Sequence, residues 1–276
     1  MNPKSFTWET SDKLKLVGQT WKTTKKEKAV IVLFHGLGEH SLRYQHVADF
    51  FTTAGISVVA FDLRGHGLSQ GLRGHAPSYD VICDDIQFVL EKTRKQFPNI
   101  PAFLYGHSLG GELVLYYLLK RKPAVKGAII TAPVLAPGAP VPPVKMLLAK
   151  MMNRVAPTFT LPNGLDRSGL SRDPQVEIKY SSDPRVHDMV SARLGMELLK
   201  NGVYILEHAK ELKTPILLMQ GSADRLVDVQ KTIELSKRVP SSVTFKMWDG
   251  FYHELHNEPK KLEVMKYELN WINKQL

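Results

Sequence analysis

Short apolar runs and longer amphipathic segments alternate along the chain. Six runs are apolar at nearly every position, which is typical of strands buried on both faces: AVIVLF (29–34), ISVVAF (56–61), AFLYG (102–106), GAIITA (127–132), PILLMQG (215–221) and VTFKMW (243–248). Between most of them, apolar residues recur at the spacing of helices, in the segments 41–55, 80–97, 109–122 and 261–276. This alternation predicts an α/β fold, with a mostly parallel sheet flanked by helices.

One long segment interrupts the alternation. Between the fourth and fifth of these strands, about eighty residues pass without a core strand. The segment begins with the proline-rich stretch VLAPGAPVPPVK and then becomes helical in MLLAKMMNRV. We therefore expect residues 1–133 and 213–276 to form two parts of one core. Residues 134–212 are expected to form a helical cap, inserted over the end of the sheet where such folds bind ligands.

Length and composition indicate the size of the core and the cellular compartment of the protein. The chain has 276 residues, 43% of them hydrophobic, which suits one large core. Its single cysteine, Cys83, permits no internal disulfide and leaves no cysteine cluster for a structural zinc. No stretch approaches the roughly 18 apolar residues of a membrane span, and the N-terminal sequence has no apolar signal region. We expect a cytoplasmic protein.

The charge balance favours contact with anionic surfaces. Lys and Arg total 37 against 27 Asp and Glu, a formal net charge of +10. The basic residues are scattered, apart from the run KTTKKEK at 22–28, and no nucleic-acid-binding motif is present. The excess charge therefore indicates solubility rather than nucleic-acid binding, and we expect no nucleic-acid partner.

The stretch FLYGHSLGG places a G-x-S-x-G motif, Gly106 to Gly110, at a predicted junction between a strand and a helix. This is the context of a nucleophile elbow, a tight turn that presents a reactive serine at the end of a strand. Glycines on both sides let neighbouring backbone approach, and the helix amides point to where negative charge would develop. Because serine is a weak nucleophile alone, Ser108 requires a histidine base and an acid.

His253 and Asp224 are the best candidates for these two roles. His253 follows the last predicted strand and Asp224 follows the strand before it, so both lie on loops at the edge of the sheet that holds Ser108. Two rivals are weaker. Asp228 is expected to cap the next helix, and His256 lies farther from its strand, where it would line the pocket.

Other loops suggest supporting roles. His35-Gly36-Leu37-Gly38 follows the first predicted strand, where one backbone amide of an oxyanion hole is expected, and Leu109 would supply the second. His35 itself is expected to be structural, as are the polar residues of FDLRGHGLS (61–69). HGLGEHS lacks the third glycine of a dinucleotide-binding loop, and HELH spaces its histidines by three instead of the four of a zinc motif. No nucleotide or metal site is predicted.

Six motifs together resemble a known family. HGLGEHSLRY, FDLRGHGLSQG, FLYGHSLGG, YSSDP, LLMQGSADRLVD and YHELHNE are similar, in this order, to the monoacylglycerol lipases and related lysophospholipases of the α/β-hydrolase superfamily. The resemblance extends from about residue 7 to the C-terminus. It implies the α/β-hydrolase fold with a helical cap, and hydrolysis of a monoacylglycerol to fatty acid and glycerol through an acyl-enzyme, without metal or organic cofactor. The alternatives are a lysophospholipase, a broader carboxylesterase of the same fold, and an inactive binding protein.

The resemblance also implies roles for individual residues. By matching position, Ser108, Asp224 and His253 would be the catalytic triad, with Leu37 and Leu109 as the oxyanion-hole amides. The polar pocket for glycerol would be formed by Glu39, Arg43, Tyr180 and His256. The chain departs from some animal members at Val227, where they have a cysteine, so thiol-directed inhibition is not expected there.

The expected cap contains a segment with two interpretations. VPPVKMLLAKMMNRVAP combines Met, Leu and Val with Lys145, Lys150 and Arg154. An amphipathic helix of this kind can place its apolar side in lipid and its cations among headgroups. Alternatively, the same apolar stripe packs on the domain beneath it. The resemblance implies a small-molecule lipid substrate and peripheral membrane contact through the cap, and we assign no oligomeric state.

Overall fold

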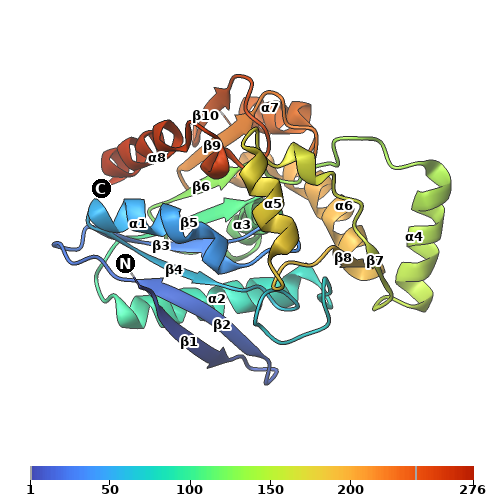
Figure 1. Ribbon diagram of the computed structural model, residues 1–276, viewed down its shortest axis with the longest axis horizontal. Coiled ribbons are helices and arrows are strands. Elements are labelled where there is room, and N and C mark those ends of the chain that lie inside the picture. Colours follow the sequence, from blue (N-terminus) through green and yellow to red (C-terminus); the bar gives the residue numbers. More distant parts are fainter. Residues whose placement is uncertain (1, 240) are drawn as a thin grey trace.

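A mixed eight-stranded sheet forms the centre of the computed structural model, which describes residues 2–239 and 241–276 (Figure 1). Its strand order is β1-β2-β4-β3-β5-β6-β9-β10, and the pairs from β4 to β10 are all parallel. The strands are β1 (Lys4–Glu9), β2 (Lys15–Trp21), β3 (Ala29–Phe34), β4 (Ile56–Phe61), β5 (Ala102–His107), β6 (Gly127–Thr131), β9 (Ile216–Gly221) and β10 (Val243–Trp248). The predicted mostly parallel sheet is therefore present, with all six predicted strands.

Helices cover both faces of this sheet. The α-helices of the described residues are α1 (Gln45–Thr53), α2 (Tyr79–Gln96), α3 (Leu109–Arg121), α4 (Pro143–Val155), α5 (Pro174–Ser182), α6 (Ala192–Glu207), α7 (Val229–Arg238) and α8 (Lys261–Gln275), of which α4 lies away from the sheet (Figure 1). Alternate strand residues separate two cores: Leu104 of β5 packs with α2 and α3, whereas Phe103 and Tyr105 pack with α1 and α8. The uninterrupted apolar runs of the sequence follow from this arrangement, because both strand faces are buried.

The sequence analysis did not predict the hairpin of β1 and β2. These strands pair with each other in antiparallel fashion, and β2 joins the sheet antiparallel to β4. β1 lies at the sheet edge and keeps exposed residues such as Lys4 and Ser5, so it has no continuous apolar run. Edge strands of this kind carry a weaker hydrophobic signal than central ones.

The segment between β6 and β9 contains α4, α5, α6 and a small antiparallel pair, β7 (Thr160–Pro162) with β8 (Met189–Ser191). α6 packs on α3 and contributes Leu194 and Ile205 to the main core, so part of the segment is integral to the domain. α4 stands away from the sheet at the far right of Figure 1 and has no buried residue. Among the described residues, no helix is long and apolar enough to cross a membrane.

Glycines allow α3 to begin directly against the sheet. A Cβ atom on Gly110 would lie 2.2 Å from the carbonyl oxygen of Phe34, at the end of β3. A Cβ atom on Gly106 would lie 2.4 Å from the carbonyl oxygen of Gly110. Both distances are shorter than any tolerable contact with backbone, so the turn between β5 and α3 requires glycine at these two positions.

Substitution of these helix glycines provides a test of the packing. We expect Gly110→Ala to lower the free energy of unfolding by about 1–3 kcal/mol, because the methyl group forces β3 and α3 apart. Gly195→Ala is the matched control. Gly195 lies in α6, and a Cβ atom there would contact only the Val190 side chain, at 3.9 Å. There alanine should stabilise the helix by about 0.5–1 kcal/mol. Urea unfolding of both variants measures the difference, and equal effects would contradict the close packing at Gly110.

Candidate active site

Ser108 occupies a strained turn between β5 and α3. Its backbone has φ 53° and ψ −117°, a conformation that costs a non-glycine residue about 1–3 kcal/mol. Three backbone bonds hold it there: Ser108 N donates to Thr131 O of β6 at 2.9 Å, and Ser108 O accepts from Glu112 N of α3 at 3.0 Å and from Val134 N at 3.4 Å. The sequence signal for this turn was the pair of flanking glycines. The hydrogen bonds to β6 and α3 keep Ser108 in this unfavourable backbone conformation.

Asp224 and His253 lie side by side on the loops that follow β9 and β10. The distance between His253 Nδ1 and Asp224 Oδ2 is 2.7 Å, and both side chains are buried. Asp224 is also fixed by Gln220, whose Nε2 donates to Oδ2 at 2.8 Å, and by the backbone N–H of Leu226. This arrangement orients the imidazole and leaves Nε2 as the ring nitrogen away from Asp224.

Ser108 and His253 line the same small cavity. Within residues 2–239 and 241–276, no hydrogen bond joins the Ser108 hydroxyl to His253. Such bonds between nucleophile and base are often long before substrate binds, and they shorten in the reacting complex. The structure therefore brings together the three residues expected at this edge of the sheet, with the acid–base pair already bonded.

The rivals of Asp224 and His253 have other positions. The Asp228 carboxylate accepts from Gln230 N at 2.9 Å and caps α7, as expected. His256 is fully buried, and its ring stacks on Tyr44 with centroids 4.6 Å apart. Neither ring nitrogen of His256 has a hydrogen-bond partner among the described residues. It does not line the cavity around Ser108.

Burial and neighbouring charge set the protonation of the site. Burial of His253 disfavours its charged form, but the charge and hydrogen bond of Asp224 outweigh this and raise the pKa of His253 above its ordinary value. Burial lowers the pKa of His107 to about 4, and the nearby charge of His253 adds to this effect. Their rings are 4.8 Å apart. At neutral pH His107 is therefore uncharged beside the candidate base.

The loop after β3 lies against Ser108. A Cβ atom on Gly36 would be 3.3 Å from the Ser108 Cβ atom, and Gly36 and Leu37 both line the cavity. Gly36 N donates to Glu39 Oε1 at 2.5 Å, which fixes the shape of this loop. Leu109 begins α3 directly after Ser108. The two residues expected to supply oxyanion-hole amides therefore flank the serine, Leu37 from the loop after β3 and Leu109 from the start of α3.

A buried ion cluster adjoins the cavity and involves one residue that the sequence analysis missed. Arg43 donates to both carboxylate oxygens of Glu254, at 2.7 and 2.8 Å, and also pairs with Glu39. Burial disfavours the charge of Glu254, but Arg43 outweighs this and holds the pKa of Glu254 well below its ordinary value. The only sequence signal for Glu254 was its place next to His253.

This cluster also bears on metal binding. Glu39, His107 and Glu254 offer ligand atoms within 4.8 Å of one another. However, the Arg43 guanidinium already pairs with both carboxylates and offsets one of their two negative charges. The residues present thus form an internal ion cluster built around an arginine.

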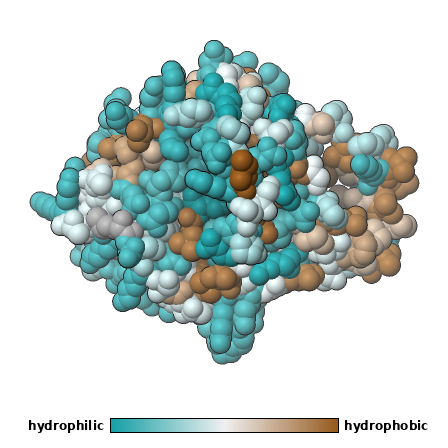
Figure 2. Space-filling model, viewed as in Figure 1, coloured by the Kyte–Doolittle hydropathy of each residue, from teal (hydrophilic) through white to brown (hydrophobic). Residues whose placement is uncertain are grey.

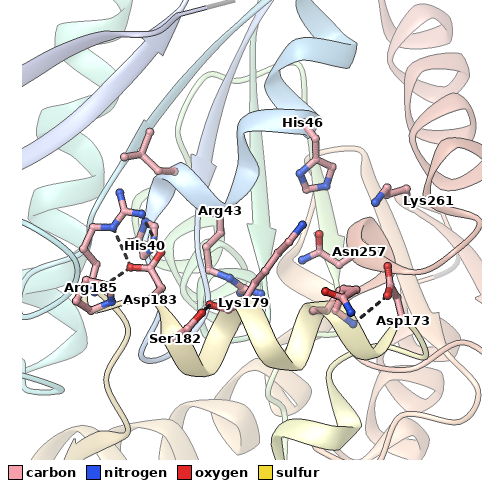
Figure 3. A pocket seen from close by; sticks show the side chains of 14 residues that line it. His40, Arg43, His46, Asp173, Lys179, Ser182, Asp183, Arg185, Asn257 and Lys261 are labelled. Atoms are coloured by element: carbon pink, nitrogen blue, oxygen red, sulfur yellow. Dashed lines mark hydrogen bonds and ion pairs between the residues drawn. The ribbon is translucent and has the colours of Figure 1, made fainter.

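The four residues expected to bind glycerol are not equivalent in the structure. Glu39 and Tyr180 line the cavity around Ser108, whereas His256 lies outside it. Arg43 stands between this cavity and a larger outer pocket, with its guanidinium 4.7 Å from the centre of the Tyr180 ring. Figure 3 shows this outer pocket, of about 650 Å³, between α5 and the start of α1, with Lys179 on one side and His46 on the other.

The cavity at Ser108 is small. Its volume is about 40 Å³, which leaves room for only a few water molecules. The core provides its floor, and the segment between β6 and β9 provides its roof through Asn163, Leu165, Leu170 and Tyr180. An ester with a long acyl chain reaches Ser108 only when parts of this roof move.

Sequence comparison shows which known proteins this chain is similar to. A sequence model of the family described as serine aminopeptidase, S33, matches residues 25–260. An abhydrolase domain-containing protein of Dictyostelium discoideum is 38% identical over 97% of this chain, which spans 28% of that longer protein. The monoglyceride lipase of Rattus norvegicus is 36% identical over 93% of this chain and 86% of its own.

A solved structure supports the same assignment. The crystal structure of Paleococcus ferrophilus monoacylglycerol lipase is 32% identical, covers 100% of both chains and superposes with a TM-score of 0.85. The fold is thus the α/β-hydrolase fold that the motifs implied. On sequence and on structure, this chain belongs to the monoacylglycerol lipase family of the α/β-hydrolase superfamily.

Proposed function

We propose that this protein is a serine hydrolase that cleaves monoacylglycerols to free fatty acid and glycerol. The observation that carries the proposal is one cavity lined by a serine in a strained strand-to-helix turn and by a histidine hydrogen-bonded to a buried aspartate. The lipases named above are described by the same substrate class. This favours monoacylglycerols over lysophospholipids, and the complete set of reactive groups argues against an inactive binding protein.

The proposed reaction has two halves. In the first, Ser108 Oγ attacks the ester carbonyl carbon while His253 Nε2 accepts the hydroxyl proton. His253 then returns this proton to the departing glycerol oxygen, and the acyl group remains on Ser108. In the second, water loses a proton to His253, attacks the acyl-enzyme and releases the fatty acid. Asp224 stabilises the imidazolium, and the N–H groups of Leu37 and Leu109 bind the oxyanion in both halves.

We also infer that the part of residues 134–212 that precedes the core-packed helix α6 acts as a cap. Its roof over Ser108 has to open for an acyl chain, and the apolar side of α4 faces solvent. Val144, Leu147 and Val155 are 79%, 70% and 76% exposed, and Figure 2 shows the apolar colour gathered over this projecting helix. This exposure favours the membrane interpretation over the alternative in which the stripe packs on the domain beneath. With Lys145, Lys150 and Arg154 beside it, the stripe suits peripheral contact with a membrane that supplies the lipid.

Replacing the nucleophile tests the reaction. Ser108→Ala should reduce turnover of monoolein by roughly 10⁶-fold, because no other group replaces the hydroxyl. Ser182→Ala removes an exposed serine of α5 and should retain full activity. Hydrolysis assays and labelling by a fluorophosphonate probe measure both variants. Labelling or near-normal turnover of Ser108→Ala would exclude the proposed mechanism.

The charge of Asp224 tests the assignment of the base. Activity requires neutral His253, whose pKa Asp224 raises, so kcat/KM should increase with pH through that pKa. In Asp224→Asn the pKa falls, and the acidic limb of the kcat/KM profile should shift to lower pH. The rate itself should fall roughly 10⁴-fold. Asp228→Asn, at the cap of α7, should leave the profile unchanged. An unshifted limb in Asp224→Asn would argue for a different base.

Vesicle binding tests the exposed stripe of α4. Leu147→Asp should reduce binding to vesicles of anionic and zwitterionic phospholipid by roughly tenfold or more, because a buried leucine contributes about 1.5–3 kcal/mol. Leu262→Asp makes the same change at an exposed leucine of α8, on the other side of the molecule (Figure 1). Sedimentation with vesicles compares the two. Equal binding by both variants would place the membrane contact elsewhere.

A further inference from the structure

The roof of the Ser108 cavity presents few polar groups to a substrate. Of its four side chains, Leu165 and Leu170 are apolar, and only Asn163 and Tyr180 carry polar atoms. The glycerol part of a monoacylglycerol carries two free hydroxyl groups beside the ester. A cavity that accepts this group in preference to a plain alkyl alcohol needs a polar group that is available to bind it.

Most polar side chains around the cavity are already engaged. Glu39 and Glu254 both bind Arg43 in the buried ion cluster, and Glu39 accepts a further bond from the Tyr44 hydroxyl at 2.8 Å. The Tyr180 hydroxyl donates to the carbonyl of Leu37 at 3.4 Å. A substrate hydroxyl would therefore have to share these groups with bonds that already exist within the protein.

Asn163 is different because only the oxygen of its side-chain amide has a hydrogen-bond partner among the residues that the structure describes. Its backbone N–H donates to Asp188 O at 2.5 Å, and its Oδ1 accepts from Leu165 N at 2.9 Å. A backbone N–H requires an acceptor, so the amide oxygen has to face Leu165. The Nδ2 group, with two N–H donors, is left over. No acceptor in the described part of the chain binds it.

We propose that Asn163 Nδ2 donates a hydrogen bond to a hydroxyl oxygen of the substrate's alcohol part, and that this bond selects glycerol esters over esters of simple alcohols. The inference rests on the proposed function, since it needs an acyl ester held at Ser108. Glycerol provides an acceptor for Nδ2 when the roof closes. An alkyl alcohol would instead exclude water from Nδ2 without offering it a hydrogen-bond acceptor. Binding of such an ester is then less favourable, because a buried donor without an acceptor loses its hydrogen bonds to water.

The test is the ratio of kcat/KM for monoolein to kcat/KM for ethyl oleate, two esters with the same acyl chain. Asn163→Ala removes the donor together with the turn that Oδ1 forms. Asn163→Asp keeps an oxygen acceptor for Leu165 N, removes the donor and adds a negative charge. We expect both variants to lower the ratio roughly tenfold, the effect of one lost hydrogen bond, while they continue to hydrolyse ethyl oleate.

Asn153→Asp is the matched control, because it introduces the same charge in α4, outside the cavity, and should keep the wild-type ratio. Partial unfolding of a variant lowers both rates together, so the ratio remains interpretable. A wild-type ratio in Asn163→Ala would overturn the proposal. So would a low ratio in Asn163→Ala with a wild-type ratio in Asn163→Asp, since the turn would then be responsible. Failure of the unmodified protein to hydrolyse either ester would contradict the proposed function itself.

Discussion

The contact between the start of α3 and the end of β3 is the constraint on which the site depends. With glycine at position 110, the helix lies directly on the backbone of β3, and Ser108 is forced into a left-handed turn. The strain at Ser108 is small compared with the packing of two buried cores that hold β5 and α3 in place. The same close approach brings the serine beside the loop after β3, where the oxyanion would be bound.

Several hydrogen bonds attach the inserted segment to the reactive loops, and two of the shortest lie beside the site. His187 N donates to Gly38 O at 2.8 Å, and Glu254 N donates to Leu170 O at 2.7 Å. One bond reaches the loop after β3 and the other reaches the residue next to His253. The roof over Ser108 is therefore an ordered part of the site, while α4 contacts the rest of the molecule mainly through α6.

The sequence was informative wherever a local pattern corresponds to one structure. The six central strands are buried on both faces, so each has a continuous apolar run, and the glycines around Ser108 identify its turn. The relation between Asp224 and His253 could also be inferred, since parallel strands end at one edge of a sheet. The hairpin of β1 and β2 was missed because its edge position leaves it only partly apolar.

Partnerships between distant side chains were not predictable from pattern. Arg43 and Glu254 are 211 positions apart, and no spacing rule connects them. His256 matched a family position for glycerol binding, yet its ring is stacked on Tyr44 in the interior. Asn163 gave no signal at all, because an Asn-Gly pair in a polar stretch indicates a turn and nothing about the cavity it faces.

The alternation of the two cores along β5 has a consequence for the evolution of this chain. Neighbouring residues of β5 face opposite helical layers, so Phe103 and Leu104 cannot exchange places without exposing a mismatch on both sides. A one-residue deletion or insertion between Ala102 and Ser108 would reverse the facing of the side chains beyond it and displace the Ser108 hydroxyl. The length of this strand is therefore more tightly constrained than the identity of its apolar residues.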